Sequence, residues 1–279
     1  MLRAWGLVRA PFTLSEKTPE LFPIQGFRPA LEQLDQCASL RSVMLVSGTA
    51  GVGKSTLIKT WMHKLDAKRF LPLLITQSTL SATGVLEMLL AKLGERSRGR
   101  RAANLRALEE HLAKLSPVTL VLVLDDAQNY PASALEEVRL LLGLGGGLRA
   151  AFALVLLGDE YLLGSLRLSV QRALLSRIGF HCALRPLARE EIAPYLNWHF
   201  HQAGLQREDL FEPAAIDLLA EASEGNPRTL NLLTQAAWLA AARDGSAATS
   251  IAAAHVTQAL QQVPAVAARI HLPAPSKAA

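Results

Sequence analysis

The stretch Gly48-Thr49-Ala50-Gly51-Val52-Gly53-Lys54-Ser55 decides the fold of this chain. It matches the phosphate-binding pattern G-x-x-x-x-G-K-[ST] at every fixed position. Its glycines let the backbone wrap so that N–H groups point inward at phosphate oxygens, and a helix beginning at Gly53 adds the positive end of its dipole. A glycine-rich turn without a ligand is the alternative. The strand expected before the stretch and the helix expected after it favour a P-loop.

The polar side chains of the P-loop have separate expected roles. Lys54 can reach the β- and γ-phosphates, and the hydroxyl of Ser55 can ligate Mg²⁺. We therefore expect ATP and Mg²⁺ as cofactors. The residues expected to contact the nucleotide are Gly48, Thr49, Ala50, Gly51, Val52, Gly53, Lys54, Ser55 and Thr56.

An acidic pair, Asp125-Asp126, ends a second apolar run that lies about 70 residues after the P-loop. Asp125, at the strand end, is expected to hold Mg²⁺ through water. Asp126 falls where a catalytic carboxylate polarises the attacking water. A simple strand-end turn is the alternative, but the P-loop upstream favours the catalytic interpretation. The two motifs together predict a nucleoside triphosphatase.

Apolar strand patterns alternate with helical patterns over the first two thirds of the chain. This alternation predicts crossover units and a parallel sheet covered on both faces. From about Leu187 only helical patterns follow, separated by Gly204 and by Gly225-Asn226-Pro227. The fold class expected is therefore an α/β core followed by a small all-helical lid. The expected strands are residues 42–47, 71–76, 118–124 and 152–157.

The expected domain boundaries follow from these patterns. Residues 1–27 form an N-terminal lead-in, residues 28–186 the α/β nucleotide-binding core, and residues 187–264 the helical lid. Residues 265–279, rich in Pro and Ala, are expected to be a flexible tail and a natural end of the chain.

Composition excludes several classes of protein. The chain has 279 residues, of which 50% are hydrophobic and 19% charged, so disorder and low complexity are excluded. Cys37 and Cys182 are too few for a disulfide scaffold, and we expect two free thiols in a reducing compartment. The apolar runs are far shorter than the roughly 18–20 residues of a membrane helix, and no export signal opens the chain. We expect a soluble, cytoplasmic protein that does not enter a membrane.

With these motifs in place, the chain resembles the AAA+ ATPases. Within them it resembles the ExeA/GspA-like group, which also includes transposition ATPases of the TnsC/TniB kind. The joint order of five short stretches carries the resemblance. They are Gly6-Leu7 with Pro11-Phe12, Asp125-Asp126-Ala127-Gln128 (the group's Asp-Glu-Ala-Gln box), residues 135–141, Leu156-Leu157-Gly158-Asp159 (the sensor-one strand) and Gly225-Asn226-Pro227-Arg228 (the sensor-two turn). The fold implied is an AAA+ P-loop core with a helical lid.

The resemblance also implies roles for polar residues outside the two motifs. Arg228, on the lid, would reach the γ-phosphate within the same subunit, and Asp159 would orient the water. Arg172 and Arg177 are candidates for an arginine offered to a neighbouring subunit, since the transition state carries spread negative charge. Such an arginine implies a homo-oligomer, a ring or a filament, with the nucleotide at the subunit interface. For each arginine a solvated surface charge is the alternative.

The chain departs from the group's pattern at three positions. Asp126 stands where the group has Glu, Asp159 where it has Gln, and Gly143 where it often has Asn. Because Asp126 is one methylene shorter than Glu, we expect hydrolysis to be slow. Residues 5–12 either pack against the adenine or belong to a hydrophobic core.

Three functions compete for the ATPase. In the first, ATP drives assembly on double-stranded DNA, and the assembly recruits or activates a transposase for target selection. The net charge of +5, the pI of about 9.5 and a basic loop support this function. For the basic loop, a solvated loop without a partner is the alternative. The residues expected to contact DNA are Arg96, Arg98, Arg100 and Arg101.

The second function is envelope or secretion assembly of the ExeA type. Full-length relatives of that type carry a membrane segment and a wall-binding domain after the ATPase, and this sequence contains neither. The third is an ATP-dependent switch that contacts only proteins. From the charge balance and the missing membrane segment we favour the first.

Overall fold

The computed structural model describes residues 2–12, 21–144, 146, 149–168, 171–207, 209–244 and 250–267. The chain divides into two compact units. The α/β unit comprises Gln25–Ala50 and Lys54–Arg185, and the helical unit comprises Met1–Ile24, Gly51–Gly53 and Pro186–Ala279. The domain boundaries expected from the sequence stay predictions.

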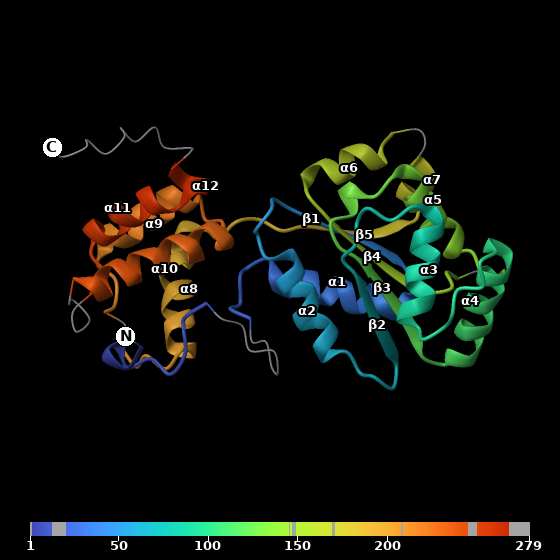
Figure 1. Ribbon diagram of the computed structural model, residues 1–279, viewed down its shortest axis with the longest axis horizontal. Helices are drawn as coiled ribbons and strands as arrows, with labels where there is room; N and C mark the ends of the chain where they lie inside the picture. Colours follow the sequence, from blue (N-terminus) through green and yellow to red (C-terminus); the bar gives the residue numbers. More distant parts are fainter. Residues whose placement is uncertain are drawn as a thin grey trace. The chain divides into compact units, whose positions relative to one another are not determined.

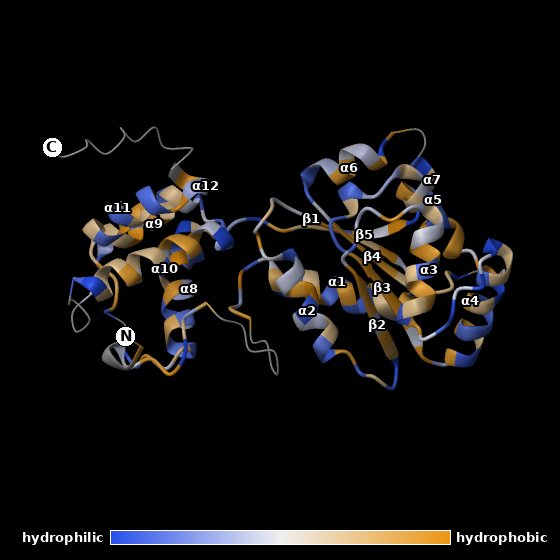
Figure 2. Ribbon diagram, viewed as in Figure 1, coloured by the Kyte–Doolittle hydropathy of each residue, from blue (hydrophilic) through white to orange (hydrophobic). Residues whose placement is uncertain are grey.

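A five-stranded parallel sheet forms the centre of the α/β unit (Figure 1). Its spatial order is β2-β3-β4-β1-β5. Every residue of β1, β3 and β4 is buried, and these strands are the most hydrophobic part of the unit (Figure 2). Strands buried on both faces are typical of parallel sheets, so the predicted fold class is confirmed. The strands are β1 (Val43–Ser47), β2 (Phe70–Ile75), β3 (Thr119–Leu124), β4 (Ala153–Gly158) and β5 (Ile178–Ala183).

Helices cover both faces of this sheet (Figure 1). Because side chains alternate along a strand, Leu120, Leu122 and Leu124 of β3 join the core under α3, α4 and α5, and the intervening valines face the opposite side. On that opposite side α1 contacts the sheet and α2. The helices of the unit are α1 (Phe27–Leu40), α2 (Lys54–Lys64), α3 (Ala82–Lys92), α4 (Arg101–Leu115), α5 (Ala132–Leu141), α6 (Glu160–Leu166) and α7 (Arg172–Leu175).

The four strands expected from the sequence are present, each within one residue of its predicted ends. The edge strand β5 was not predicted. Its residues alternate between half-buried and exposed, and it contains Gly179 and His181, so it lacks the apolar run that marks the central strands. The helix after the P-loop begins at Lys54, one residue later than expected. The run Gly145-Gly146-Gly147 predicts the end of the helix before it, and Gly145 and Gly147 lie outside the described residues.

The helical unit is built around α10, which contacts α9 and α11. The start of the chain belongs to this unit, since the N–H of Val8 donates to the carbonyl of Ala203 at 2.8 Å. The ring of Trp5 meets that of Trp238 edge to face, with centroids 6.4 Å apart. Most of the expected tail, residues 268–279, lies outside the described residues. The helices are η1 (Leu2–Trp5), α8 (Arg189–Gln202), α9 (Pro213–Ser223), α10 (Pro227–Arg243), α11 (Ala253–Gln262) and α12 (Pro264–Ala267).

Candidate active site

The P-loop connects the end of β1 to the first residue of α2. Gly51 and Gly53 have φ angles of 88° and 104°, in the region that side-chain-bearing residues rarely adopt. The loop therefore takes a path that only glycine follows without strain at these positions, which is what the sequence motif predicts.

Lys54 is buried at the beginning of α2, with 8% of its surface exposed. Its Nζ donates hydrogen bonds to the carbonyl oxygens of Gly48 at 2.6 Å and Thr49 at 3.1 Å. The ammonium group is thus held against the loop that precedes it. A phosphate group can replace these carbonyls as the acceptor, because the lysine has three N–H donors.

Four acidic residues influence the charge of this lysine. Burial lowers the pKa of Lys54, and the negative charges of four acidic residues oppose that shift. Such opposition is the pattern of a cation that is desolvated and then compensated by neighbouring charge. In decreasing order of influence the acidic residues are Asp126, Asp125, Asp159 and Glu160.

Ser55 and Asp125 meet beside the P-loop. The hydroxyl of Ser55 donates to Oδ2 of Asp125 at 2.9 Å, and Oδ1 of Asp125 accepts the N–H of Asp126 at 3.0 Å. Asp125 is 8% exposed, directly after β3. A hydroxyl and a carboxylate oxygen are hard donors of the kind that Mg²⁺ prefers, so this pair fits the metal.

Asp126 follows in a left-handed backbone conformation, with a φ of 49°. Its Oδ1 accepts a hydrogen bond from Nε2 of Gln128 at 3.4 Å. Oε1 of the same glutamine accepts the N–H of Asp159 at 3.3 Å. Gln128, within η2 (Ala127–Asn129), therefore links the carboxylate of Asp126 to the end of β4.

Sequence reasoning assigned no role to Gln128, although the four-residue box 125–128 contained the signal. The structure adds a second requirement at Gly158. A Cβ at that position would lie 3.1 Å from Oε1 of Gln128 and 2.4 Å from Cδ2 of Leu162. The absence of a side chain at residue 158 therefore leaves the space in which the glutamine and α6 approach β4.

Asp159 lies at the beginning of α6. Its Oδ1 accepts the backbone N–H groups of Tyr161 at 3.0 Å and Leu162 at 3.1 Å, which caps the helix. The carboxyl ends of the neighbouring strands β3 and β4 thus bring Asp125, Asp126 and Asp159 to one edge of the sheet. A role for Asp159 in orienting water stays a prediction.

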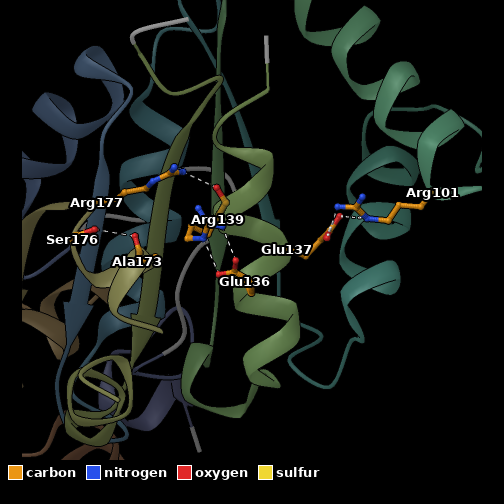
Figure 3. Close-up of polar contacts among 7 residues, drawn as sticks. All are labelled: Arg101, Glu136, Glu137, Arg139, Ala173, Ser176 and Arg177. Carbon is orange, nitrogen blue, oxygen red and sulfur yellow. Dashed lines mark hydrogen bonds and ion pairs between the residues drawn. The ribbon is translucent and has the colours of Figure 1, made fainter. Parts of the chain in front are cut away.

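The candidate arginines lie in three places: Arg172 on α7, Arg177 in the turn between α7 and β5, and Arg228 on α10. Arg172 begins α7 and is exposed, as is Arg177 after it. Nη1 of Arg177 donates to the carbonyl of Arg139 at 2.7 Å, which ties its side chain to α5 (Figure 3). Arg228 lies in the first turn of α10, where its N–H donates to the capping side chain of Asn226 at 3.1 Å. The catalytic roles of these three arginines stay predictions.

The basic residues 96–101 divide into two groups. Arg96, Arg98 and Arg100 are exposed in the connection between α3 and α4. Arg101 is the first residue of α4, and its guanidinium donates to both carboxylate oxygens of Glu137, at 3.2 and 2.9 Å (Figure 3). The side chain of Glu137 is only 6% exposed, so Arg101 neutralises a buried charge. DNA contact by the four arginines stays a prediction.

Residues 37–166 match the AAA domain family model. The chain is 26% identical over 247 residues to General secretion pathway protein A of Aeromonas hydrophila, a match that covers 87% of this chain and 45% of that protein. The chain therefore spans less than half the length of this relative. In the part of the chain that the structure describes, no helix has both the length and the apolar character needed to span a membrane.

Solved structures with the same fold include the Aeropyrum pernix ORC1 protein in complex with DNA, with a TM-score of 0.68 at 17% identity, covering 93% of this chain and 71% of that one. Cdc6p from Pyrobaculum aerophilum gives a TM-score of 0.65 at 18% identity, over 94% of this chain and 71% of that one. The Thermotoga maritima RuvB branch migration motor gives a TM-score of 0.56 at 18% identity, over 85% of this chain and 67% of that one. This chain therefore has the fold of an AAA+ P-loop NTPase, with a parallel α/β core that contains an AAA domain and a helical region after it.

Proposed function

We propose that the chain is a Mg²⁺-dependent ATPase. The observation that carries this proposal is the convergence of Lys54, the Ser55–Asp125 pair and Asp126 on one edge of the sheet. A buried lysine, a pair of hard oxygen ligands and a further carboxylate are the parts that phosphoryl transfer to water requires.

Each residue has a definite task in this proposal. The N–H groups of the P-loop bind the phosphates, and Lys54 exchanges the carbonyls of Gly48 and Thr49 for phosphate oxygens. Ser55 and Asp125 hold Mg²⁺, which supplies charge neutralisation at the phosphates when bound. Asp126 orients the attacking water and accepts its proton, because its carboxylate is free of the metal pair.

Four further polar residues complete the proposal. We assign to Asp159 a share in orienting the water, and to Arg228 a contact with the γ-phosphate in the same subunit. Arg172 or Arg177 acts on the nucleotide of a neighbouring subunit, so that the active form is a homo-oligomeric ring or filament. Charge spread over the transition state is what makes such arginines effective.

We further propose that ATP drives assembly of the chain on double-stranded DNA, and that the assembly recruits or activates a transposase. The net charge of +5 supports an anionic partner, as does the basic segment 96–101. The solved structure of the Aeropyrum pernix ORC1 protein, which has the same fold, contains DNA. A cytoplasmic location follows from this proposal.

A second candidate function is favoured by one specific observation. The 26% identical relative is a general secretion pathway protein, and the match covers most of this chain. In that function the ATPase would serve envelope or secretion assembly. A protein-interaction switch without DNA is the third candidate.

Electron microscopy with ATP, with and without duplex DNA, separates these functions. For the DNA function we expect rings or filaments that form only when DNA and ATP are both present and that dissolve as salt is raised, because phosphate contacts are salt-sensitive. Assembly that forms equally well without DNA would contradict it and favour the other two. A transposase gene or secretion genes beside this gene would then distinguish the partner.

A further inference from the structure

The amino ends of the five strands form a second edge of the sheet, opposite the P-loop. Because all strand pairs are parallel, the residues that precede the strands gather at this edge (Figure 1). A basic residue precedes four of the five strands: Arg41 before β1, Lys68 and Arg69 before β2, Arg149 before β4 and Arg177 before β5. With neighbouring strands about 4.8 Å apart, the amino ends of the five strands span roughly 19 Å.

A cavity of about 270 Å³ opens at this edge, where β2 and β3 begin. Two cationic side chains, two hydroxyl-bearing residues and the rings of Phe70 and Pro117 line it. Hydroxyl, ammonium and guanidinium groups are the donors that bind phosphate oxygens in proteins. The residues that line the cavity are Ser39, Lys68, Arg69, Phe70, Pro117 and Thr119.

Two of the cations are held in place by neutral partners. Nε of Arg41 donates to Oγ1 of Thr119 at 3.3 Å, which leaves the threonine O–H free to donate to a ligand. The guanidinium carbon of Arg69 lies 5.0 Å from the centroid of the Phe70 ring. In addition, the carbonyl of Arg69 accepts the N–H of Thr119 at 2.8 Å. The cavity is therefore preorganised without neutralising its charge.

No carboxylate in the described part of the chain forms an ion pair with Arg41, Lys68 or Arg69. Asp66, two residues before Lys68, uses its Oδ1 to accept the backbone N–H of that lysine at 2.9 Å. Helix dipoles explain cations in the last turn of a helix, but Lys68 and Arg69 follow the end of α2 by four and five residues. Their positive charge is thus available to an anion.

We propose that the amino-edge site, defined as Ser39, Arg41, Lys68, Arg69 and Thr119, binds a backbone phosphate of duplex DNA. This inference rests on the proposed DNA function and assigns its surface to a different place from residues 96–101. The cavity accommodates one phosphate group, and the row of cations continues along the edge with Arg149 and Arg177. A free phosphate ion shares the chemistry of the cavity but gains nothing from the row, so an extended polyanion fits the whole surface.

The test compares two double variants that each remove two positive charges. Lys68→Gln/Arg69→Gln alters the amino-edge site, and Arg96→Gln/Arg98→Gln is the matched control. Binding of fluorescent duplex DNA in the presence of ATP is measured by anisotropy between about 50 and 200 mM salt. Because the two side chains share one phosphate, and each lost phosphate contact lowers the salt slope by about 0.9, we expect a slope smaller by about 0.9 and binding about tenfold weaker at ~100 mM salt for the amino-edge variant.

The expected result is a larger change for the amino-edge variant than for the control. ATP affinity at the opposite edge serves as the measure of folding and is expected to stay at the wild-type value. An amino-edge variant that keeps the wild-type slope, or a control that loses as much, would overturn the inference while leaving the DNA function intact. Wild-type chain that binds no DNA at low salt would overturn both.

A second experiment distinguishes DNA from free phosphate as the ligand of the amino-edge site. The thermal midpoint of Lys54→Ala chain, whose P-loop is disabled, is measured in inorganic phosphate, and the same is done after adding Lys68→Gln/Arg69→Gln. If phosphate stabilises the chain only when Lys68 and Arg69 are present, and the chain binds no DNA, the ligand of the site is a free anion. That result would overturn the proposal. DNA binding that needs the two residues, with weak or no effect of phosphate alone, supports it.

Discussion

The two edges of the central sheet carry opposite charges on the same five strands. At the carboxyl edge three aspartates, Asp125, Asp126 and Asp159, lie around one buried lysine, Lys54. At the amino edge the cations before β1 and β2 have no acidic partner among the described ion pairs. A parallel sheet produces such a contrast readily, because every strand contributes one residue to each edge.

The edges also differ in how their charged groups are bound. The carboxylates accept hydrogen bonds from Ser55, from Gln128 and from the first turn of α6, so their oxygens have fixed directions. The cations of the amino edge are positioned by a threonine hydroxyl and a phenylalanine ring. Fixed acceptors suit a metal and a water molecule, whereas unneutralised donors suit an anion without a metal.

The largest effect is expected from Asp126→Asn. Because the amide cannot accept a proton from water, we expect turnover to fall by about 10³-fold, within the range of general-base losses. ATP affinity should stay within a few-fold of the wild type, because Lys54 and Ser55 are unchanged. Phosphate release and equilibrium nucleotide binding measure the two quantities. Unchanged phosphate release would contradict the assignment of Asp126.

Lys54→Ala is expected to weaken ATP binding by about 100-fold, which corresponds to the loss of charge-assisted hydrogen bonds worth about 2.7 kcal/mol. Titration with a fluorescent ATP analogue measures the affinity. The matched control is Lys68→Gln, which removes a lysine charge from the opposite edge and should leave ATP affinity unchanged. Equal losses in both variants would mean that net charge, rather than the P-loop, determines nucleotide binding.

Arg101→Gln is expected to lower the free energy of unfolding by about 2 kcal/mol, because it leaves the buried carboxylate of Glu137 without its cation. Arg98→Gln, an exposed neighbour, should change stability by less than about 0.5 kcal/mol. Urea unfolding of the two variants measures the difference. If both variants are as stable as the wild type, the ion pair has no structural role and Arg101 is as available to DNA as its neighbours.

The smallest effect is expected from Gln128→Ala. Loss of the link between Asp126 and the end of β4 should reduce turnover about tenfold without changing ATP affinity, since the glutamine positions the carboxylate and touches no expected phosphate group. A turnover equal to the wild type would show that Asp126 holds its direction without this link. Gln128→Glu places a second carboxylate beside Asp126, and the two negative charges repel each other. We therefore expect the turnover of this variant to be at least as slow as that of Gln128→Ala.

The sequence predicted those parts of the fold that depend on local patterns. The strands β1, β3 and β4 are apolar on both faces and were recognised by composition alone, while β5 escaped because Gly179 and His181 interrupt its hydrophobic pattern. Ser55 and Asp125 were each expected at Mg²⁺ from a separate motif, and the structure joins them by a hydrogen bond. The motifs did not predict a position for residues 5–12. In the structure, Trp5 packs against Trp238 of the helical unit.

Features that depend on strand order were beyond sequence reasoning. Gln128 reaches the N–H of Asp159 only because β3 and β4 are neighbours, and these residues are 31 positions apart. In the same way Arg41 and Lys68 precede different strands and resemble ordinary surface charges until the topology brings them to one edge. The catalytic arginines, the transposase partner and the cytoplasmic location stay predictions.

Hydrogen–deuterium exchange on the wild-type chain tests most directly whether the carboxyl edge binds nucleotide and the amino edge binds DNA. A non-hydrolysable ATP analogue with Mg²⁺ should slow exchange in residues 48–56 and 125–129, at the carboxyl edge. Duplex DNA added next should slow exchange in residues 39–43, 66–71 and 117–119, at the amino edge. Protection by DNA confined to residues 96–101, or an ATP analogue that protects neither carboxyl-edge segment, would contradict this account.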